Sequence, residues 1–418
     1  MATWLIDSGT LTDIADAIRA KTGSAATIQV SDLATEIANI PTGGTINKTR
    51  NITCLAAYNF SAGDRVAIST GFLSIFSDPP SSAVNRLAMN KTKTTLAAAI
   101  NNSPYITIYD ITTSPETKLS NPDTLPTGSA SAITFNEAGT LCAVGHSTSP
   151  YLTVYDTTTT PWTKLTNPNT LPGGKVLDIA FNKTGTLCLC AHQSSPYMTA
   201  YDTTTTPWTK LTNPVNLPIN SGSAACFTDD GTKAALAWGA KIFIYDTTTT
   251  PWTKTNQISK SSTFSAVKYF NNDTRLIALF GTSPYLLLYD TSTYTEINNI
   301  LPEDLPNGGT YMKLSEDEQE LSIFTTSNQY KSYILDVNGD TFTYRRPYPI
   351  NYTYDAEWKG TNIYIGRGSS TYMQKYDATN LYATTYNTID QSTIYKTLGY
   401  VKNNMSINDI GPAVEIFY

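Results

Sequence analysis

The sequence has little charge and very little histidine. Charged residues make up 15% of the 418 residues, and there are two histidines. Globular proteins usually contain about a quarter charged residues, so we expect a polar but sparsely charged surface. The net charge is −6 and no run of Lys and Arg occurs. Because affinity for nucleic acid comes largely from clustered Lys and Arg, we do not expect a nucleic-acid partner.

Scarce histidine also leaves acid–base catalysis without its usual residue at neutral pH. His146 and His192 lie 46 residues apart, in the same slot of two successive repeats. We therefore do not expect them to converge on one substrate atom. No Cys-x-x-Cys or His-Glu-x-x-His pattern occurs, and the turn at residues 136–139 lacks the alternating carboxylates that calcium needs. We expect no enzyme activity, no metal and no cofactor.

Cysteines are few and long apolar runs are missing. Cys142 and Cys188 occupy equivalent repeat positions within apolar segments, which favours buried free thiols over a disulfide framework. The first ten residues lack the basic and apolar regions of a signal peptide, and no apolar run approaches about 18 residues. We expect a protein made in the cytoplasm of the cell that produces it, without membrane insertion.

Repetition is what the sequence has in abundance. The stretch SPYLTVYDTTTTPWTKL at 149–165 recurs as SPYMTAYDTTTTPWTKL at 195–211 and as KIFIYDTTTTPWTK at 241–254. A Tyr-Asp pair marks each unit at intervals of 44 to 46 residues, with its tyrosine at Tyr109, Tyr155, Tyr201, Tyr245 and Tyr289. Units repeated at a fixed period bury their apolar faces against their neighbours.

Each strong unit contains four strand-like pieces, as at 176–182, 187–192, 197–202 and 208–211. Four short strands in about 42 to 46 residues are typical of a β-propeller blade. Within the motif, Asp156 can accept N–H groups of the following turn, and Trp162 supplies apolar area between blades. The pattern resembles WD40 and YVTN-type propellers, in which a strand ends in an aliphatic or aromatic residue followed by Asp.

The inner strands predict the number of blades. We place them near Arg86, Ile133, Ile179, Cys226, Val267, Met312, Ala356 and Thr397, which predicts an all-β, eight-bladed propeller of antiparallel meanders. Seven blades with an irregular insertion is the alternative. The propeller would span 72–418, with residues 45–71 as a β linker. The strand at 72–77 would complete the last blade, because the chain ends on a piece like a third strand and an open edge is unfavourable.

Residues 1–44 differ from the rest and predict two short helices. Leu11, Ile14 and Ile18 share one face of the first, and Leu33 and Ile37 belong to the stripe of the second. Helices this short are not stable alone, so we expect them to pack on a partner or a sister chain. The segments LTDIADAIRAKTG and DLATEIANI resemble a leader found at the front of many virion structural proteins of phages and prophages of Firmicutes. The resemblance implies attachment to a particle.

Tyrosines outside the repeated slots gather in the degenerate C-terminal blades, beside arginines. Aromatic rings with polar rims suit sugars or proteins, although these blades can also use tyrosine for packing alone. The candidate recognition surface consists of Tyr344, Arg345, Arg346, Tyr348, Tyr352, Arg367 and Tyr372.

Together these features predict a phage virion protein. Residues 1–44 would anchor it to other virion proteins, and the propeller would bind a glycan or protein of the bacterial surface. A homo-oligomer is compatible with this arrangement. Two alternatives stay open: a purely structural capsid-decoration or tail component, and a propeller enzyme that degrades surface polysaccharide.

Overall fold

The structure is a computed structural model, and all of its described elements are β-strands. The chain forms two compact units, one from residues 74–375 and the other from 1–73 with 376–418. The expected helices with Leu11, Ile14, Ile18, Leu33 and Ile37 lie outside the described residues. The described residues are 47–54, 65–69, 72–76, 78–298, 300, 305, 308–315, 317–325, 332–347, 353–360, 362–369, 371–377, 382–385, 398–401 and 410–416.

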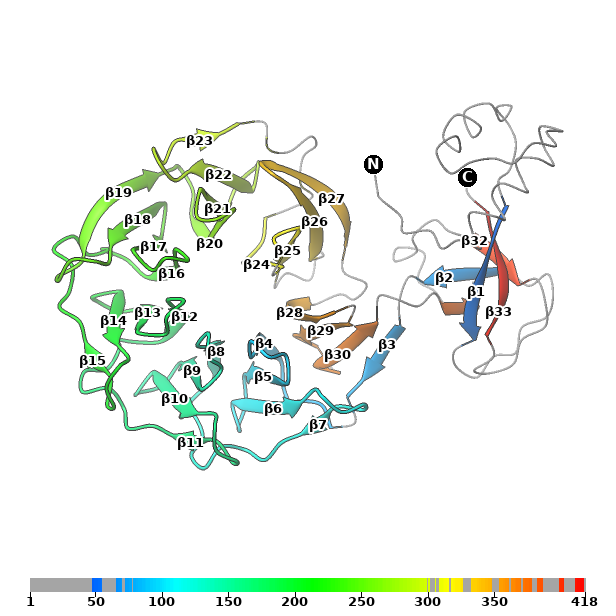
Figure 1. Cartoon of the computed structure of the whole chain (residues 1–418), viewed down its shortest axis with the longest axis horizontal. Coiled ribbons are helices and arrows are strands. Elements are labelled where there is room, and N and C mark those ends of the chain that lie inside the picture. The colour runs from blue at the N-terminus through cyan, green and yellow to red at the C-terminus, as the bar shows by residue number, and fades with distance from the viewer. Residues whose placement is uncertain are drawn as a thin grey trace. The chain divides into compact units, whose positions relative to one another are not determined.

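Seven four-stranded antiparallel sheets surround a central axis as the blades of a β-propeller (Figure 1). The first three blades are β4 (Val84–Met89), β5 (Thr95–Ile100), β6 (Ile106–Asp110) and β7 (Thr117–Lys118); β8 (Ala130–Phe135), β9 (Leu141–His146), β10 (Leu152–Asp156) and β11 (Thr163–Lys164); and β12 (Val176–Phe181), β13 (Leu187–His192), β14 (Met198–Asp202) and β15 (Thr209–Lys210).

The next three blades have longer or less regular outer strands. They are β16 (Gly222–Phe227), β17 (Lys233–Trp238), β18 (Lys241–Asp246) and β19 (Thr253–Ser259); β20 (Phe264–Phe270), β21 (Arg275–Phe280), β22 (Leu286–Asp290) and β23 (Glu296–Ile297); and β24 (Tyr311–Leu314), β25 (Glu320–Phe324), β26 (Tyr333–Asn338) and β27 (Thr341–Pro347).

The seventh blade joins two distant parts of the chain. Its strands are β28 (Thr353–Lys359), β29 (Asn362–Arg367), β30 (Met373–Asp377) and β3 (Phe72–Ile75), in that order. In Figure 1 the blue β3 lies beside the orange β30 at the edge of this blade. The segment expected to close the ring is therefore a fourth blade strand, and its neighbour is β30 rather than the end of the chain.

The prediction of eight blades was wrong. The segment expected as an eighth inner strand near Thr397 leads into a separate closed five-stranded sheet, in the order β1-β31-β2-β32-β33. Its strands are β1 (Asn47–Cys54), β2 (Arg65–Ser69), β31 (Tyr382–Thr385), β32 (Leu398–Val401) and β33 (Ile410–Ile416). Residues 45–71 likewise supply two of these strands instead of a linker. Short apolar strands look alike in sequence, and their partners are decided by contacts far along the chain.

Neighbouring blades hold each other through shared apolar clusters. One cluster contains Ile108 of β6 together with Val144 of β9 and Trp162, which packs edge-on against Phe135 with ring centroids 5.7 Å apart. The repeated tyrosine is fully buried, and the Tyr155 hydroxyl donates to a main-chain carbonyl of the loop that enters its blade, at 2.8 Å. The equivalent tyrosines of blades one, three and four do the same. Blades one to four therefore each fix the segment that leads into them, whereas the Tyr289 hydroxyl of blade five is buried without such a bond.

The Tyr-Asp motif has the local role that its sequence predicts. Asp156 Oδ1 accepts the Thr158 N–H at 2.8 Å and the Thr158 hydroxyl at 2.6 Å. The equivalent Asp246 makes the same two bonds with Thr248, which lower the pKa of its carboxyl below the usual value. The buried free thiols are confirmed at Cys142, Cys188, Cys190 and Cys226. The residues that recur in the repeat therefore stabilise the propeller fold.

The seam between blades seven and one departs from the repeat. Glu116 stands where the motif elsewhere has tryptophan, and it is buried. Its Oε1 accepts the Lys375 ammonium at 2.7 Å and the Tyr364 hydroxyl at 3.2 Å, both from blade seven. Burial raises the pKa of Tyr364, and the Glu116 charge raises it further. Polar bonds therefore join the first and last blades at the position where aromatic packing joins the others.

Replacing Glu116 by Ala should weaken this seam strongly. The change removes the carboxylate that accepts from the Lys375 ammonium at 2.7 Å and from the Tyr364 hydroxyl at 3.2 Å, so we expect the free energy of unfolding to fall by about 1–3 kcal/mol. Lys118→Ala is the control, because its ion pair with Asp78 is solvent-exposed and should contribute no more than about 0.5 kcal/mol. Urea denaturation measures both, and equal losses in the two variants would contradict the proposed seam.

Candidate functional site

The inner strand of each blade lines a central channel. In six of these strands the pairing with the second strand shifts by one residue near the start, which marks a β-bulge. Side chains at the bulge reach the next inner strand: the Ser131 hydroxyl donates to the Val176 carbonyl at 2.6 Å, and the Ser265 hydroxyl to the Gly309 carbonyl at 2.8 Å. The bulges therefore tie blade to blade around one mouth of the channel.

Two tiers of side chains follow the bulge along each inner strand. They are two residues apart and so project to the same side of the strand. By strand register, the first tier consists of Arg86, Ala132, Asp178, Ala224, Ala266, Tyr311 and Asp355. The second tier consists of Ala88, Thr134, Ala180, Cys226, Lys268, Lys313 and Glu357.

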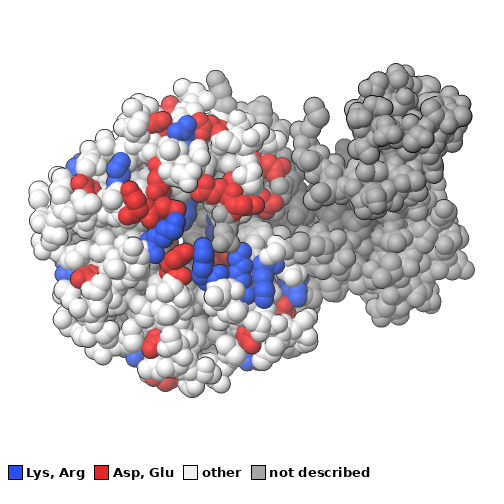
Figure 2. Space-filling model, viewed as in Figure 1, with Lys and Arg blue, Asp and Glu red and all other residues white. Residues whose placement is uncertain are grey.

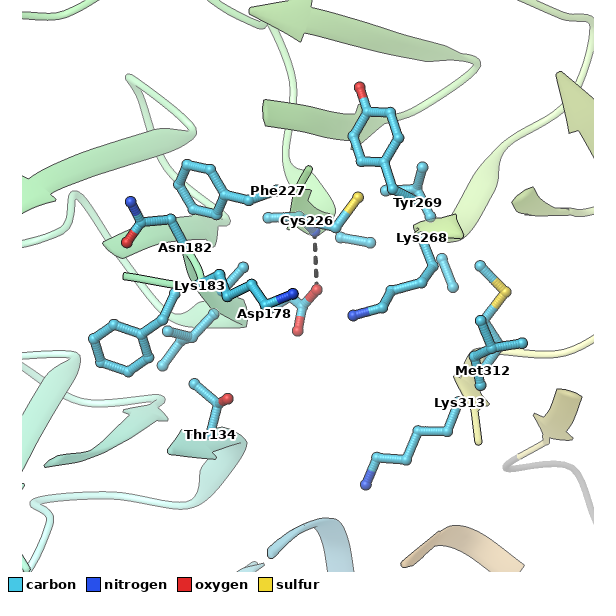
Figure 3. A pocket seen from close by; sticks show the side chains of 18 of the residues that line it. Thr134, Asp178, Asn182, Lys183, Cys226, Phe227, Lys268, Tyr269, Met312 and Lys313 are labelled. Atoms are coloured by element: carbon cyan, nitrogen blue, oxygen red, sulfur yellow. Dashed lines mark hydrogen bonds between the residues drawn. The ribbon is translucent and has the colours of Figure 1, made fainter. Parts of the chain in front are cut away.

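Charged side chains concentrate around this channel. In Figure 2, blue and red atoms gather at the centre of the propeller, whereas the blades around it are mostly white. Ten of the fourteen tier residues line a cavity of about 570 Å³, among them Asp178, Lys268 and Lys313 (Figure 3). The small fraction of charged residues in the chain is thus used disproportionately at the channel, where six of the fourteen tier positions are charged and five are alanine.

On the side of blades six, seven and one, the charges are tied together. The Lys313 ammonium lies 2.7 Å from Glu357, 3.1 Å from Asp355 and 2.8 Å from the Leu87 carbonyl. Asp355 is fully buried and also accepts the Leu87 and Ala356 N–H groups at 2.7 and 2.8 Å. Burial lowers the pKa of Lys313, but the two carboxylates more than offset this and hold it above the usual value.

The remaining cation on that side is stacked. The Arg86 guanidinium lies 3.9 Å from the centre of the Tyr311 ring, and its Nη1 donates to the Asn85 carbonyl at 2.8 Å. A cation over an aromatic face is a favourable arrangement in a partly desolvated site. This contact joins Arg86 of blade one to Tyr311 of blade six. The charged groups on this side of the channel therefore have partners within the protein.

Asp178 and Lys268 face the cavity from the other side, on blades three and five. Asp178 has the same tier position as Asp355, and its carboxylate accepts the Ala225 N–H at 2.9 Å. Burial raises the pKa of Asp178 to about 6, while the bond from Ala225 and the charges of Arg86 and Lys268 oppose the rise. Figure 3 shows the carboxylate and the Lys268 ammonium pointing toward each other across open space.

These two groups do not form an ion pair with each other. Among the residues that the structure describes, Lys268 has neither a hydrogen bond nor an ion-pair partner. The side chains between and around them are small, with Ala180, Ala224 and Cys226 on the intervening strands. Lys183, Lys313 and other charged residues that line the cavity have ion-pair partners, so Asp178 and Lys268 stand out as opposite charges that do not pair with each other.

Two opposite charges that face one cavity are suited to binding a charged ligand. Hydrolysis of a glycosidic bond uses two carboxyl groups that flank the scissile bond. Of the three channel carboxylates in the described tiers, Asp355 and Glu357 are held by Lys313, and only Asp178 is directed into the cavity without an ion pair. The described residues also contain no group of three or more His, Cys, Asp or Glu side chains arranged to hold a metal ion.

The predicted recognition residues fall on blades six and seven. Tyr344, Arg345 and Arg346 lie on β27, the outer strand of blade six, while Tyr348 and Tyr352 lie outside the described residues. Arg367 and Tyr372 belong to one hairpin of blade seven. The Arg367 guanidinium donates to Thr371 Oγ1 at 2.8 Å and to Gln374 Oε1 at 3.1 Å, and Tyr372 packs against the core at the seam.

The two histidines lie in the scaffold. His146 and His192 are fully buried, and each Nε2 lies 2.9 Å from the hydroxyl of a threonine on the adjacent strand, Thr153 or Thr199. Burial lowers the pKa of each histidine to about 4. Both imidazoles are therefore neutral at pH 7 and away from the channel residues described above.

Sequence reasoning missed Asp178 and Lys268. Asp178 shares its tier position with three alanines but also with Arg86 and Asp355, and Lys268 shares its position with Ala88, Ala180 and Lys313. Alignment of the inner strands by register would have brought these charged positions together. The repeated motif lies on the third and fourth strands of each blade, so it gives no information about the inner strand. The signal was a departure from the repeat at the inner strand.

No known family matches this sequence, and no curated protein is similar to it in sequence. Similar solved structures include the β-propeller domain of Myceliophteria thermophila Cps50 (Swd1), at 11% identity and a TM-score of 0.56, covering 73% of this chain and 99% of that one. The comparisons establish the β-propeller fold. A chain of the mitotic checkpoint complex has 13% identity, coverage of 77% and 92%, and a TM-score of 0.56. Kuenenia stuttgartiensis hydrazine synthase has 14% identity and a TM-score of 0.56, with coverage of 76% of this chain and 98% of that one.

These neighbours differ from one another in what their names describe, so the likeness carries the fold alone. No helix capable of crossing a bilayer is found in the part of the chain that the structure describes.

Replacing Asp178 by Asn should stabilise the protein at neutral and alkaline pH. A carboxyl whose pKa rises from 3.8 to about 6 on folding costs stability as pH rises through that window. Asn removes the charge and can still accept the Ala225 N–H. We expect a gain on the order of 1 kcal/mol at pH 8, vanishing below pH 4.

The matched control is Asp355→Asn in the same tier. It leaves the buried Lys313 ammonium with one carboxylate fewer, so it should destabilise the protein at pH 8. Urea denaturation at several pH values measures both variants. A loss of stability in Asp178→Asn at pH 8 would show that its carboxylate is structural.

The histidines should act in the opposite direction. A histidine whose pKa falls from 6.5 to about 4 on folding contributes stability that is complete above pH 6.5 and is lost as pH falls toward 4. We expect both imidazole signals in NMR to titrate near pH 4, with thermal stability decreasing over the same range. An imidazole of either residue that titrates near 6.5 would contradict the buried, neutral assignment.

Proposed function

We propose that this protein acts by binding, as a virion structural protein of a phage that displays its propeller for recognition of a bacterial surface glycan or protein. Residues 1–44 attach it to other virion proteins. The observation that carries the binding role is the division of labour in the propeller. The residues that repeat from blade to blade serve packing and turns. Residues that differ from the repeat lie at the channel and in the last blades.

The leader resemblance supports the virion part of the proposal. It rests on the two segments that contain Leu11, Ile14, Ile18, Leu33 and Ile37. A propeller suits display because its blades hold a rigid ring, while loops and inner-strand side chains vary without disturbing the packing. β27 is longer than the two-residue rim strands of blades one to three, and Tyr344, Arg345 and Arg346 lie along it.

Cell binding tests the recognition role. Labelled full-length protein is incubated with a panel of Firmicutes strains, beside a variant with Tyr344, Arg345 and Arg346 all changed to Ser. We expect binding to at least one strain and about a tenfold loss in the variant, since a few aromatic and arginine residues carry most of the energy of an interface. The control is Lys254→Ser with Gln257→Ser on β19, the equally long rim strand of blade four.

Particle assembly tests the anchoring role separately. Leu11→Asp with Ile14→Asp places charge on the apolar face of the first helix and should remove the protein from particles without changing cell binding. Full-length protein that binds no strain while still entering particles would overturn the recognition role and leave the structural one. Entry of the double Asp variant into particles would overturn the anchor.

A further inference from the structure

We propose that the propeller channel is a binding site for a small zwitterion of the amino-acid class, with the ligand ammonium on Asp178 and the ligand carboxylate on Lys268. This inference goes beyond surface recognition and does not depend on whether the protein belongs to a virion. It rests on the two opposite charges that face one cavity without pairing with each other.

The rest of the channel shows what these charges would do if they were structural. Lys313 takes two carboxylates and a backbone carbonyl at 2.7 to 3.1 Å, and Arg86 stacks on Tyr311 at 3.9 Å. Asp355, at the same tier position as Asp178, is covered by Lys313 and fully buried. The protein thus pairs its channel charges closely on one side and leaves two apart on the other.

Unpaired charge in a confined site is costly, because burial removes water from the charged form. For Asp178 this cost is visible in its raised pKa, whereas the Lys268 side chain is exposed to solvent and bears no such cost. Charges kept at a cost to stability are typical of sites that bind or react. A ligand that brings both an ammonium and a carboxylate satisfies both groups at once, through charge-assisted hydrogen bonds.

The size and lining of the cavity fit a small polar molecule. The space of about 570 Å³ lies within the range of small-molecule sites. Its walls near Asp178 and Lys268 are formed by small residues, including Ala180, Ala224 and Cys226, so the ligand can lie between the two charges. Lys183 stands nearer the mouth and is bound to Asp229 at 2.8 Å.

A neutral sugar is the main competitor for this space, because hydroxyl groups can also bridge a carboxylate and an ammonium. Sugar sites commonly offer an aromatic face for stacking. Here Arg86 covers the Tyr311 ring, and Phe135 and Phe181 pack edge-on against Trp162 and Trp208. Three of the five aromatic rings that line the cavity have these contacts, whereas Asp178 and Lys268 are not paired with each other, which favours the zwitterion.

The test uses full-length protein at pH 8 and a panel of α-amino acids with γ-aminobutyrate and 6-aminohexanoate. Saturation-transfer NMR detects binding, and calorimetry measures the affinity of the ligands that bind. We expect at least one zwitterion to bind, and its N-acetyl and carboxamide derivatives to bind about tenfold more weakly, because each lacks one of the two charges.

Asp178→Asn and Lys268→Gln should each weaken binding by about tenfold. Asp178→Asn is expected to be no less stable than the parent at pH 8, so its loss of affinity would not reflect unfolding. Melting curves serve the same purpose for Lys268→Gln, and Lys118→Gln on the outer rim is the control that should bind normally. The proposal is overturned if no zwitterion binds, if a singly charged derivative binds equally well, or if glucose or N-acetylglucosamine binds through Asp178 instead.

Discussion

The contact between neighbouring blades is the constraint on which this structure depends. A four-stranded sheet with two apolar faces is not stable by itself, and each blade buries its faces only against the blades beside it. Shared clusters such as the one that joins Ile108, Val144 and Trp162 make this concrete. A row of blades would still leave two exposed ends, so the ring must close. β3 supplies the outer strand of the last blade, and Glu116 supplies polar bonds at the seam where a tryptophan would otherwise lie.

That constraint also explains how strictly the repeat is kept. The motif tyrosine holds the entering loop, the aspartate closes the next turn, and the tryptophan fills the gap toward the preceding blade. All three residues recur together in blades two, three and four, because these blades face the same packing problem. The side chains of the inner strand have fewer contacts to maintain in every blade. Its backbone already pairs with the second strand, and its bulge is hydrogen-bonded to the next blade. Small residues are sufficient at several of its tier positions, and alanine fills five of the fourteen. Any larger or charged side chain there must have another reason.

Much of the fold was accessible from the sequence. The period of Tyr109, Tyr155, Tyr201, Tyr245 and Tyr289 predicts blades, and the turn chemistry of Asp156 was confirmed. The blade number was not, because the strands at 398–401 and 410–416 have the same local character as blade strands and pair elsewhere. β-strands carry no local record of their partner. Pairing with β1 over seven residues, from Asn47 opposite Ile416 to Thr53 opposite Ile410, decides the place of the last strand, and only the folded chain shows it.

From the sequence, the channel residues could be found only by looking for positions that differ from the repeat. A repeated residue reports the packing that all blades share, so it says little about function. A residue that breaks the repeat, where its neighbours show that alanine suffices, reports something particular to its blade. Asp355 and Lys313 break it and then satisfy each other, which explains them within the scaffold. Asp178 breaks it at a cost in solvation, and Lys268 breaks it without a described partner. The bond from Ala225 gives Asp178 a role between blades three and four, but no described contact pairs Asp178 with Lys268, and a ligand that carries both charges would bridge them.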